Sequence, residues 1–264
     1  MATIVTLLSD FGSTSPYPAA MKAVIAGLCD ATLIDITHDV RRHDVRMGAY
    51  LLAAVAPWLP AGTVHLAVVD PGVGTARRAL IVQAGGQWFV GPDNGLLLPA
   101  ARRVGQPRVY EITSREFLTS AVSSTFHGRD VFAPIASRLA VGTPAEVLGT
   151  PVAEYVNLEF GTGRRRGDTL SGSIIYVDPF GNLITNIASE LLGGLGKSVQ
   201  VRVGRRVRAA RIALTYGEVA KADLAVVPGS DGLVEIAVRE GSAASVLGAS
   251  AEAAVSITPR ATGS

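Results

Sequence analysis

Apolar runs alternate with amphipathic stretches through the first part of the chain. Continuous apolar and β-branched runs favour buried strands, whereas apolar residues that recur every three or four positions favour helices. Strands are predicted at 4–8, 32–37, 63–69, 79–83, 87–90 and 109–113. Helices are predicted at 19–28, 45–58, 96–104 and 131–140. This alternation predicts an α/β domain with a mainly parallel sheet that is flanked by helices on both faces.

The pattern changes after Val152, where short apolar runs between Gly-rich and polar turns replace the long helical stretches. Strands are predicted at 172–177, 199–203, 209–214, 224–227, 234–238 and 254–258, with one helix at 242–247. This spacing favours a small β-barrel or β-sandwich domain. We therefore predict an amino-terminal domain at 1–157, a linker at 158–170 and a carboxyl-terminal domain at 171–264. The basic run at 164–166 is interpreted as part of a solvated linker rather than as a phosphate-binding patch.

Composition narrows the class of protein. A hydrophobic content of 48% in 264 residues is sufficient for a sizeable core, and a net charge of +2 gives no reason to expect a nucleic acid partner. A single cysteine, Cys29, excludes an internal disulfide and a cluster of thiolate metal ligands. No signal-like segment precedes the first strand, and no apolar run approaches the ~18 residues of a membrane span. We expect a soluble, cytoplasmic protein without a membrane partner.

Three predicted strands end on an aspartate, namely Asp10, Asp70 and Asp93. Open α/β sheets place their sites at such strand ends. In residues 68–78 a strand stops at Asp70, a Pro-Gly-x-Gly turn follows, and two arginines precede the next strand. This order brings a carboxylate and a guanidinium to one edge of the sheet, although an ordinary hairpin turn is the alternative. Asp10 suits a pair of ribose hydroxyls because a carboxylate accepts from both, and a capping role in a turn is its alternative.

Two further regions contain candidate site residues. His127 lies in a polar approach to a helix and is the candidate for handling a proton or binding water, with helix capping as the alternative. In residues 178–186, Asn182 can read an adenine edge and Phe180 can stack on a purine, although a plain β-turn also fits. Ser230 lies between two predicted strands, where a hairpin turn is the alternative to ligand contact.

Taken together, these stretches resemble the S-adenosyl-methionine (SAM) hydroxide adenosyltransferases, which are relatives of the enzymes that make 5′-fluoro- or 5′-chloro-adenosine. The motifs that carry the resemblance are Ser-Asp-Phe-Gly (9–12), Asp-Pro-Gly-Val-Gly-Thr-Ala-Arg-Arg (70–78), Gly-Pro-Asp-Asn-Gly-Leu (91–96), Thr-Phe-His-Gly-Arg-Asp (125–130), Asp-Pro-Phe-Gly-Asn-Leu-Ile-Thr-Asn-Ile (178–187) and Gly-Ser-Asp-Gly-Leu-Val-Glu-Ile-Ala (229–237). The resemblance implies a larger α/β domain, a small β-barrel-like domain, and a homotrimer with sites between neighbouring subunits.

The resemblance also implies a role for each candidate residue. Asp70, Arg77 and His127 look like the residues that hold the attacking water. The halogenases carry other residues at the Asp and His positions, so this chain is similar to the branch that uses water. The residues similar to the family's substrate contacts are Asp10 for ribose, Phe180 and Asn182 for adenine, and Asp178 and Ser230 for the methionine end.

The expected reaction is attack of water on C5′ of SAM, which yields adenosine and methionine without a metal or other cofactor. The chain departs from the family pattern at Ser15, His43 and Asp231, which leaves open the contacts to the methionine end. Three alternatives also stay open. They are a halide-using adenosyl transferase, a hydrolase with a divalent metal ion held by Asp10, Asp70 and Asp93, and a non-enzymatic sensor of SAM or a nucleoside.

Overall fold

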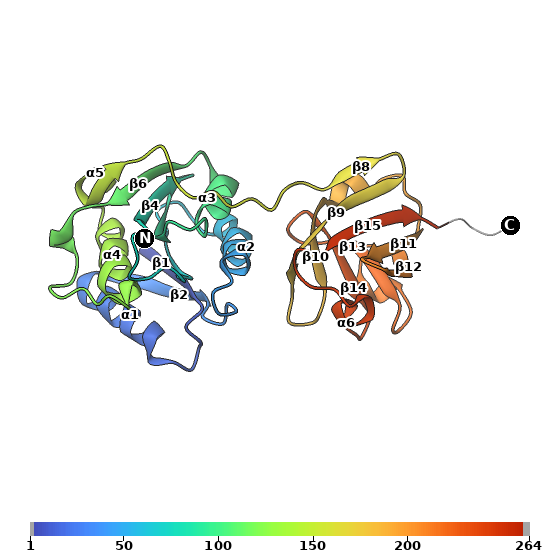
Figure 1. Cartoon of the computed structure of the whole chain (residues 1–264), viewed down its shortest axis with the longest axis horizontal. Helices are drawn as coiled ribbons and strands as arrows, with labels where there is room; N and C mark the ends of the chain where they lie inside the picture. Colours follow the sequence, from blue (N-terminus) through green and yellow to red (C-terminus); the bar gives the residue numbers. More distant parts are fainter. Residues whose placement is uncertain (1–2, 261–264) are drawn as a thin grey trace. The chain divides into compact units, whose positions relative to one another are not determined.

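The computed structural model describes residues 3–260, whose contacts form two units with the boundary between Glu159 and Phe160 (Figure 1). Each unit encloses a hydrophobic core of its own. Among the helices of the described residues, none is long and apolar enough to cross a membrane.

A seven-stranded sheet with the order β2-β1-β3-β5-β4-β6-β7 forms the centre of the first unit. Its strands are β1 (Thr3–Ser9), β2 (Ala31–Thr37), β3 (Val64–Val68), β4 (Ala79–Ala84), β5 (Gln87–Pro92), β6 (Arg108–Ile112) and β7 (Gly149–Pro151). The neighbouring pairs from β2 to β5 are parallel. Those from β5 to β7 are antiparallel. The sheet is therefore mixed, and the prediction of a mainly parallel sheet is wrong.

A tight turn explains the change of direction. β4 and β5 are joined by Gly85 and Gly86, which have φ angles of +56° and +75°. Two consecutive residues with positive φ form the kind of turn that joins antiparallel strands, and Gly-Gly is among the pairs that favour it. The Gly-Gly pair was present in the sequence, but the prediction of a mainly parallel sheet did not take it into account.

Two pairs of helices cover the sheet. α1 (Pro16–Leu28) packs against α4 (Ala133–Ala140), and α2 (Val45–Val55) packs against α3 (Leu98–Val104), on the opposite side of the sheet in Figure 1. The helix predicted at 45–58 ends at Val55 and continues as the 3₁₀ turn η1 (Ala56–Trp58), because the ring of Pro57 cannot continue the helical ladder. The further elements of this unit are the 3₁₀ turn η2 (Arg115–Phe117), the π-helical turn η3 (Gly128–Phe132) and the short helix α5 (Ala145–Leu148).

The second unit is a closed β-barrel. Its eight strands have the order β10-β14-β13-β12-β11-β15-β9-β8, and a further pairing of β9 with β10 closes seven of them into the barrel. The strands are β8 (Arg164–Arg166), β9 (Thr169–Val177), β10 (Leu183–Ala188), β11 (Ser198–Val203), β12 (Arg206–Ile212), β13 (Leu224–Pro228), β14 (Leu233–Val238) and β15 (Ala254–Pro259). The 3₁₀ turns η4 (Ser189–Leu192) and η5 (Tyr216–Glu218) and the helix α6 (Ala243–Leu247) connect them.

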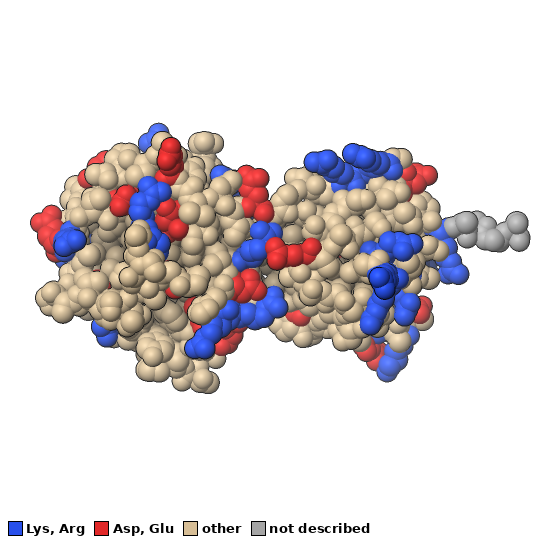
Figure 2. Space-filling model, in the orientation of Figure 1, with Lys and Arg blue, Asp and Glu red and all other residues tan. Residues whose placement is uncertain are grey.

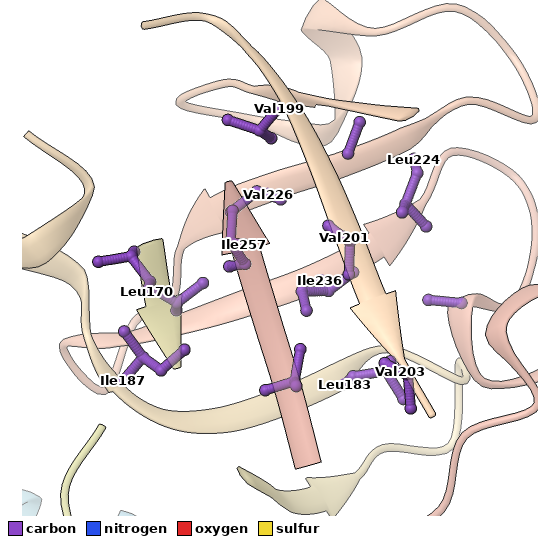
Figure 3. Packing of buried hydrophobic residues seen from close by; sticks show 14 of the residues in the cluster. Leu170, Leu183, Ile187, Val199, Val201, Val203, Leu224, Val226, Ile236 and Ile257 are labelled. Atoms are coloured by element: carbon purple, nitrogen blue, oxygen red, sulfur yellow. The ribbon is translucent and has the colours of Figure 1, made fainter. Parts of the chain in front are cut away.

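Alternating side chains fill this barrel. Val199, Val201 and Val203 of β11 are buried while the residues between them are exposed, and they meet Ile236 and Ile257 in the core (Figure 3). This alternation is the period of two that a half-buried strand requires.

Two details of the second unit correct the sequence analysis. β10 was not predicted as a strand, although it pairs with both β9 and β14. The run Arg164–Arg166 was interpreted as solvated linker, but it forms β8, which pairs with β9. The Arg165 side chain donates to the carbonyls of Leu191 and Gly193, which fixes it against the barrel.

Candidate active site

Parallel pairing brings three predicted site residues to one edge of the first sheet. β1 pairs with β3 so that Ser9 lies opposite Val68, and Asp10 and Asp70 therefore follow at the same edge. β5 is also parallel to β3 and is followed by Asp93. Side chains at this edge can converge because the carboxyl ends of parallel strands lie side by side.

Asp70 and Arg77 form a buried ion pair. Nε of Arg77 donates to Oδ1 of Asp70 at 2.9 Å and to Oδ2 at 3.1 Å, and Nη2 of Arg77 also donates to Oδ2. The side chains are only 5% and 11% exposed, respectively. A tight turn brings them together, since Val73 N–H donates to the Asp70 carbonyl and the Thr75 hydroxyl donates to the Gly72 carbonyl. This planar two-point contact uses the fork geometry that only arginine offers.

His127 completes this group, although it follows Arg77 by 50 residues in the chain. Nη2 of Arg77 contacts Nδ1 of His127 at 2.7 Å. Arginine can only donate, so Nδ1 accepts and the proton of the neutral imidazole lies on Nε2. Burial lowers the pKa of His127 below 6.5, and the positive charge of Arg77 lowers this pKa further, against the opposing effect of the Asp70 and Asp130 carboxylates. The ring is therefore neutral near pH 7 and presents an N–H donor.

The π-helical turn η3 determines where His127 lies. His127 immediately precedes this turn, and its side chain makes no capping hydrogen bond, which argues against the capping alternative. A Cβ on Gly128 would lie 3.0 Å from Sδ of Met21 and 3.3 Å from the Phe126 ring, so this position favours glycine. Single π-helical turns inside helices occur frequently at functional sites, because they redirect one residue.

A small cavity of about 30 Å³ opens beside this group. Asp70 and His127 lie on its wall together with the rings of Phe11 and Phe126. One water molecule fits, since a water needs roughly 10–15 Å³ and two or more polar partners. Arg77 is not among the lining residues. It hydrogen-bonds to both Asp70 and His127 and so holds these two side chains in position.

Asp93 pairs with the second arginine of the motif. Nε and Nη2 of Arg78 donate to Oδ2 of Asp93 at 2.9 and 2.7 Å, and Oδ1 accepts from Val156 N–H at 2.8 Å. Nη2 of Arg78 also donates to the Glu154 carbonyl, so this pair fastens the segment at 154–156. Within residues 3–260, no group of three or more His, Cys, Asp and Glu side chains is arranged to hold a metal ion. The geometry therefore does not favour the metal-dependent alternative.

Asp10 is not among the residues that line the water-sized cavity, although the next residue, Phe11, is. Its Oδ2 accepts from His43 N–H at 2.8 Å, and His43 has a positive φ of 64°. This contact positions the carboxylate while leaving Oδ1 for a ligand. Ser15, which replaces an Asp of the family pattern, donates its hydroxyl to the Gly12 carbonyl at 3.1 Å.

In the second unit, a turn around Asp178 presents the two residues proposed to bind adenine. Oδ1 of Asp178 accepts from Phe180 N–H and Asn182 N–H, and Oδ2 accepts from Nδ2 of Asn182, at 2.8–2.9 Å. The Phe180 ring is 79% exposed, which is unusual for a large apolar side chain and suits a stacking surface. All three residues line a cavity of about 700 Å³.

The sequence analysis missed two polar residues of this cavity, Tyr216 and Glu235. The only signal was the position of Glu235 in the Leu-Val-Glu-Ile-Ala motif at 233–237, where a charged residue interrupts an apolar strand. Ser230 does not line the cavity. It lies in the turn between β13 and β14, where Gly229 N–H donates to the Leu233 carbonyl, as the hairpin alternative predicted.

Comparisons with known proteins identify the class to which this fold and these residues belong. The amino-terminal domain of the SAM hydroxide adenosyltransferases matches residues 5–149, and the carboxyl-terminal domain of the same family matches residues 172–256. The chain therefore belongs to the SAM hydroxide adenosyltransferase family.

Individual relatives match most of the chain. The chain is 45% identical to an (R)-S-adenosyl-L-methionine hydrolase of Salinispora tropica, covering 92% of this chain and 93% of that protein. It is 42% identical to a protein of the same name from Thermus thermophilus, over 92% and 95% of the two chains. A fluorinase of an Actinoplanes species is more distant, with 28% identity over 76% and 77%. A crystal structure of an uncharacterized conserved protein from Thermotoga maritima has a TM-score of 0.91 and 37% identity, covering 97% of this chain and 100% of that chain.

Proposed function

We propose that this protein hydrolyses SAM to adenosine and methionine by attack of water on C5′. The observation that carries the proposal is the water-sized cavity whose wall includes Asp70 and His127, both held by Arg77. Support also comes from the relatives at 42–45% identity, which are named (R)-S-adenosyl-L-methionine hydrolases.

The reaction is a substitution at carbon. The water oxygen forms a bond to C5′, the C5′–S bond breaks, and its electron pair remains on sulfur, so methionine leaves as a neutral thioether. No general acid is needed for this leaving group, and positioning a weak nucleophile in line with the breaking bond is the main task. A metal or other cofactor has no step to perform in this mechanism.

Each polar residue of the first site has a distinct task in this mechanism. Asp70 accepts a hydrogen bond from the water through a lone pair that Arg77 leaves free, and takes up the proton that the water loses. Nε2–H of His127 donates to the water oxygen and orients its remaining lone pair toward C5′. Arg77 is a positioning residue because it touches Asp70 and His127 rather than the cavity.

The carboxylate on the cavity wall also disfavours the halide-using alternative. A halide ion placed there would face the negative charge of Asp70 in a buried position, where like charges repel more strongly than in water. A neutral water molecule experiences no such repulsion. We therefore propose water, and not chloride or fluoride, as the nucleophile.

Substrate binding is proposed to use both units. Asp10 accepts from the ribose hydroxyls, the Phe180 ring stacks on adenine, and Asn182 reads its edge. Asp178 and Ser230 are assigned to the methionine end, as the family resemblance implies. The relatives' names specify the (R) sulfonium epimer, and we propose the same preference here.

We further propose that the protein is a homotrimer in which neighbouring chains contribute to each site. The support is the family resemblance, which assigns site residues to both domains. A cytoplasmic location is part of the same proposal. A permanently charged sulfonium does not cross a bilayer readily, so an enzyme that consumes it must lie in the compartment that contains it.

Isotope labelling tests the proposed reaction. The purified protein is incubated with each SAM epimer in oxygen-18 water that contains chloride, and the nucleoside product is analysed by mass spectrometry. The expected result is adenosine with the label at the 5′ oxygen, formed faster from the (R) epimer. Unlabelled adenosine, 5′-chloroadenosine as the main product, or tight binding without turnover would each contradict the proposal.

A further inference from the structure

The cavity of the second unit is larger than a base-stacking surface requires. Its volume of about 700 Å³ lies in the range that encloses a whole small-molecule ligand rather than one ring. Phe180 and Asn182 account for its proposed contacts to adenine, and Asp178 is assigned to the methionine end, whereas Tyr216 and Glu235 on the same wall have no assigned ligand.

Glu235 projects from β14 into this cavity. The hydroxyl of Tyr216 donates to Oε1 of Glu235 at 2.6 Å, whereas Oε2 accepts no hydrogen bond from any residue in the described range 3–260. Burial raises the pKa of Tyr216, and its bond to Glu235 raises this pKa further, so the phenol remains a donor. The carboxylate is thus held in a defined orientation with one oxygen available to a ligand.

The other charged side chains of the cavity are already engaged. Asp178 accepts three hydrogen bonds within its own turn. Nη1 of Arg239 donates to the Gly217 and Val219 carbonyls, and Glu240 pairs with Lys221 at 2.6 Å. Glu235 differs from these groups because its carboxylate is partly buried, has no cationic partner among residues 3–260 and accepts a side-chain hydrogen bond only at Oε1.

The charges around Glu235 favour a cation. Burial raises the pKa of Glu235, and the negative charges of Asp178 and Asp231 raise it further, while the hydrogen bond from Tyr216 opposes them. A positively charged group bound here would relieve this repulsion and supply the missing donor. SAM carries two such charges, a sulfonium and an α-ammonium, and only the ammonium has N–H donors.

We infer that Glu235 is a specificity-determining residue that binds the α-ammonium group of the methionine part of the substrate. The inference rests on the proposed function and extends it to the methionine end, where Ser15 and Asp231 depart from the family pattern. Tyr216 acts as a positioning residue because its hydroxyl orients the carboxylate.

The test compares Glu235→Gln with the wild-type enzyme, using SAM, its analogue with hydrogen in place of the α-amino group, and adenosine. Because Gln keeps an acceptor but lacks the negative charge that pairs with the ammonium, Glu235→Gln should raise KM for SAM roughly 10-fold or more, with kcat within about twofold. KM for the des-amino analogue and the dissociation constant of adenosine should not change. Tyr216→Phe should raise KM for SAM by a smaller factor.

A matched control is Glu218→Gln, which removes an exposed carboxylate from the turn that contains Tyr216 and should leave all values at wild-type levels. Equal weakening of SAM and adenosine by Glu235→Gln would assign Glu235 to the nucleoside and overturn the inference, as would an unchanged KM for SAM. If the wild-type enzyme does not turn over SAM, the proposed function fails separately, and calorimetric binding of SAM and adenosine to the same variants still decides the role of Glu235.

Discussion

Two consecutive arginines, Arg77 and Arg78, have different partners and should respond differently to the same substitution. Arg77→Lys keeps the charge but loses the planar fork that holds Asp70 and His127 together. We expect kcat to fall by roughly 10² with KM nearly unchanged, since positioning groups commonly contribute 10²–10⁴ in rate. Steady-state kinetics with SAM measures both values.

Arg78→Lys is the matched control. It weakens the contact to Asp93 and the segment at 154–156, so the expected effect is a loss of about 1 kcal/mol in the free energy of unfolding, with kcat near wild type. Thermal unfolding of the two variants separates the effects. Full activity in Arg77→Lys together with a slow Arg78→Lys would show that the wrong arginine has been assigned.

The protonation state of His127 predicts a pH profile. Its pKa lies below 6.5, so the neutral ring persists as the pH falls through 6.5 and is lost only at lower pH. Protonation would place a second N–H against the Arg77 guanidinium and break their contact. We expect kcat/KM to stay constant from pH 8 to about 6.5 and to fall below it.

His127→Ala should lower kcat by roughly 10²–10⁴ and remove this acid limb. The measurement is the pH dependence of kcat/KM for the wild type and the variant. An acid limb centred above pH 6.5 that disappears in His127→Ala would contradict the lowered pKa, and an unchanged kcat in His127→Ala would make His127 a structural residue.

At the scale of the elements, strand ends and one irregular turn build the first site. β1 and β3 deliver Asp10 and Asp70 to one edge of the sheet, and the π-helical turn η3 brings His127 to the same place from a segment far along the chain. The strands were predictable because their apolar runs are local. The π-helical turn was not, because the space that favours glycine at position 128 is limited by Met21, which lies more than 100 residues away in the chain.

Strand direction was the weakest part of the fold prediction. Alternation of strands and helices favours parallel pairing, but the Gly85-Gly86 turn makes β4 and β5 a hairpin and reverses the remaining strands of the sheet. In the second unit, β10 begins directly after the Asp178 turn, and its residues were interpreted only as part of a binding motif. A short segment can serve both purposes, because side chains at the start of a strand also line the adjacent turn.

At the scale of the whole molecule, the proposed homotrimer makes a prediction about mixed assemblies. Asp70→Ala removes the first unit's contribution to the site, and Phe180→Ala removes the second unit's contribution. If each site takes the two halves from neighbouring chains, unfolding and refolding the two inactive variants together should restore part of the activity, because some sites in mixed trimers are intact. Light scattering should give the mass of three chains.

Refolding each variant alone is the control, and it should restore no activity. An active monomer at the assay concentration would contradict the trimer. If the mixture forms trimers but regains no activity, the protein is a trimer in which one chain supplies both halves of each site.

The sequence by itself determined the two kinds of domain, most strand positions and the residue types at the site, because periodicity and turn chemistry depend on neighbours in the chain. Only the tertiary structure decided which arginine holds Asp70, which nitrogen of His127 carries the proton, and how large the adjoining cavity is. It also brought Tyr216 to Glu235, which no motif joins. These contacts link residues up to 50 positions apart, and their geometry follows from how the sheet, the turns and the core pack together.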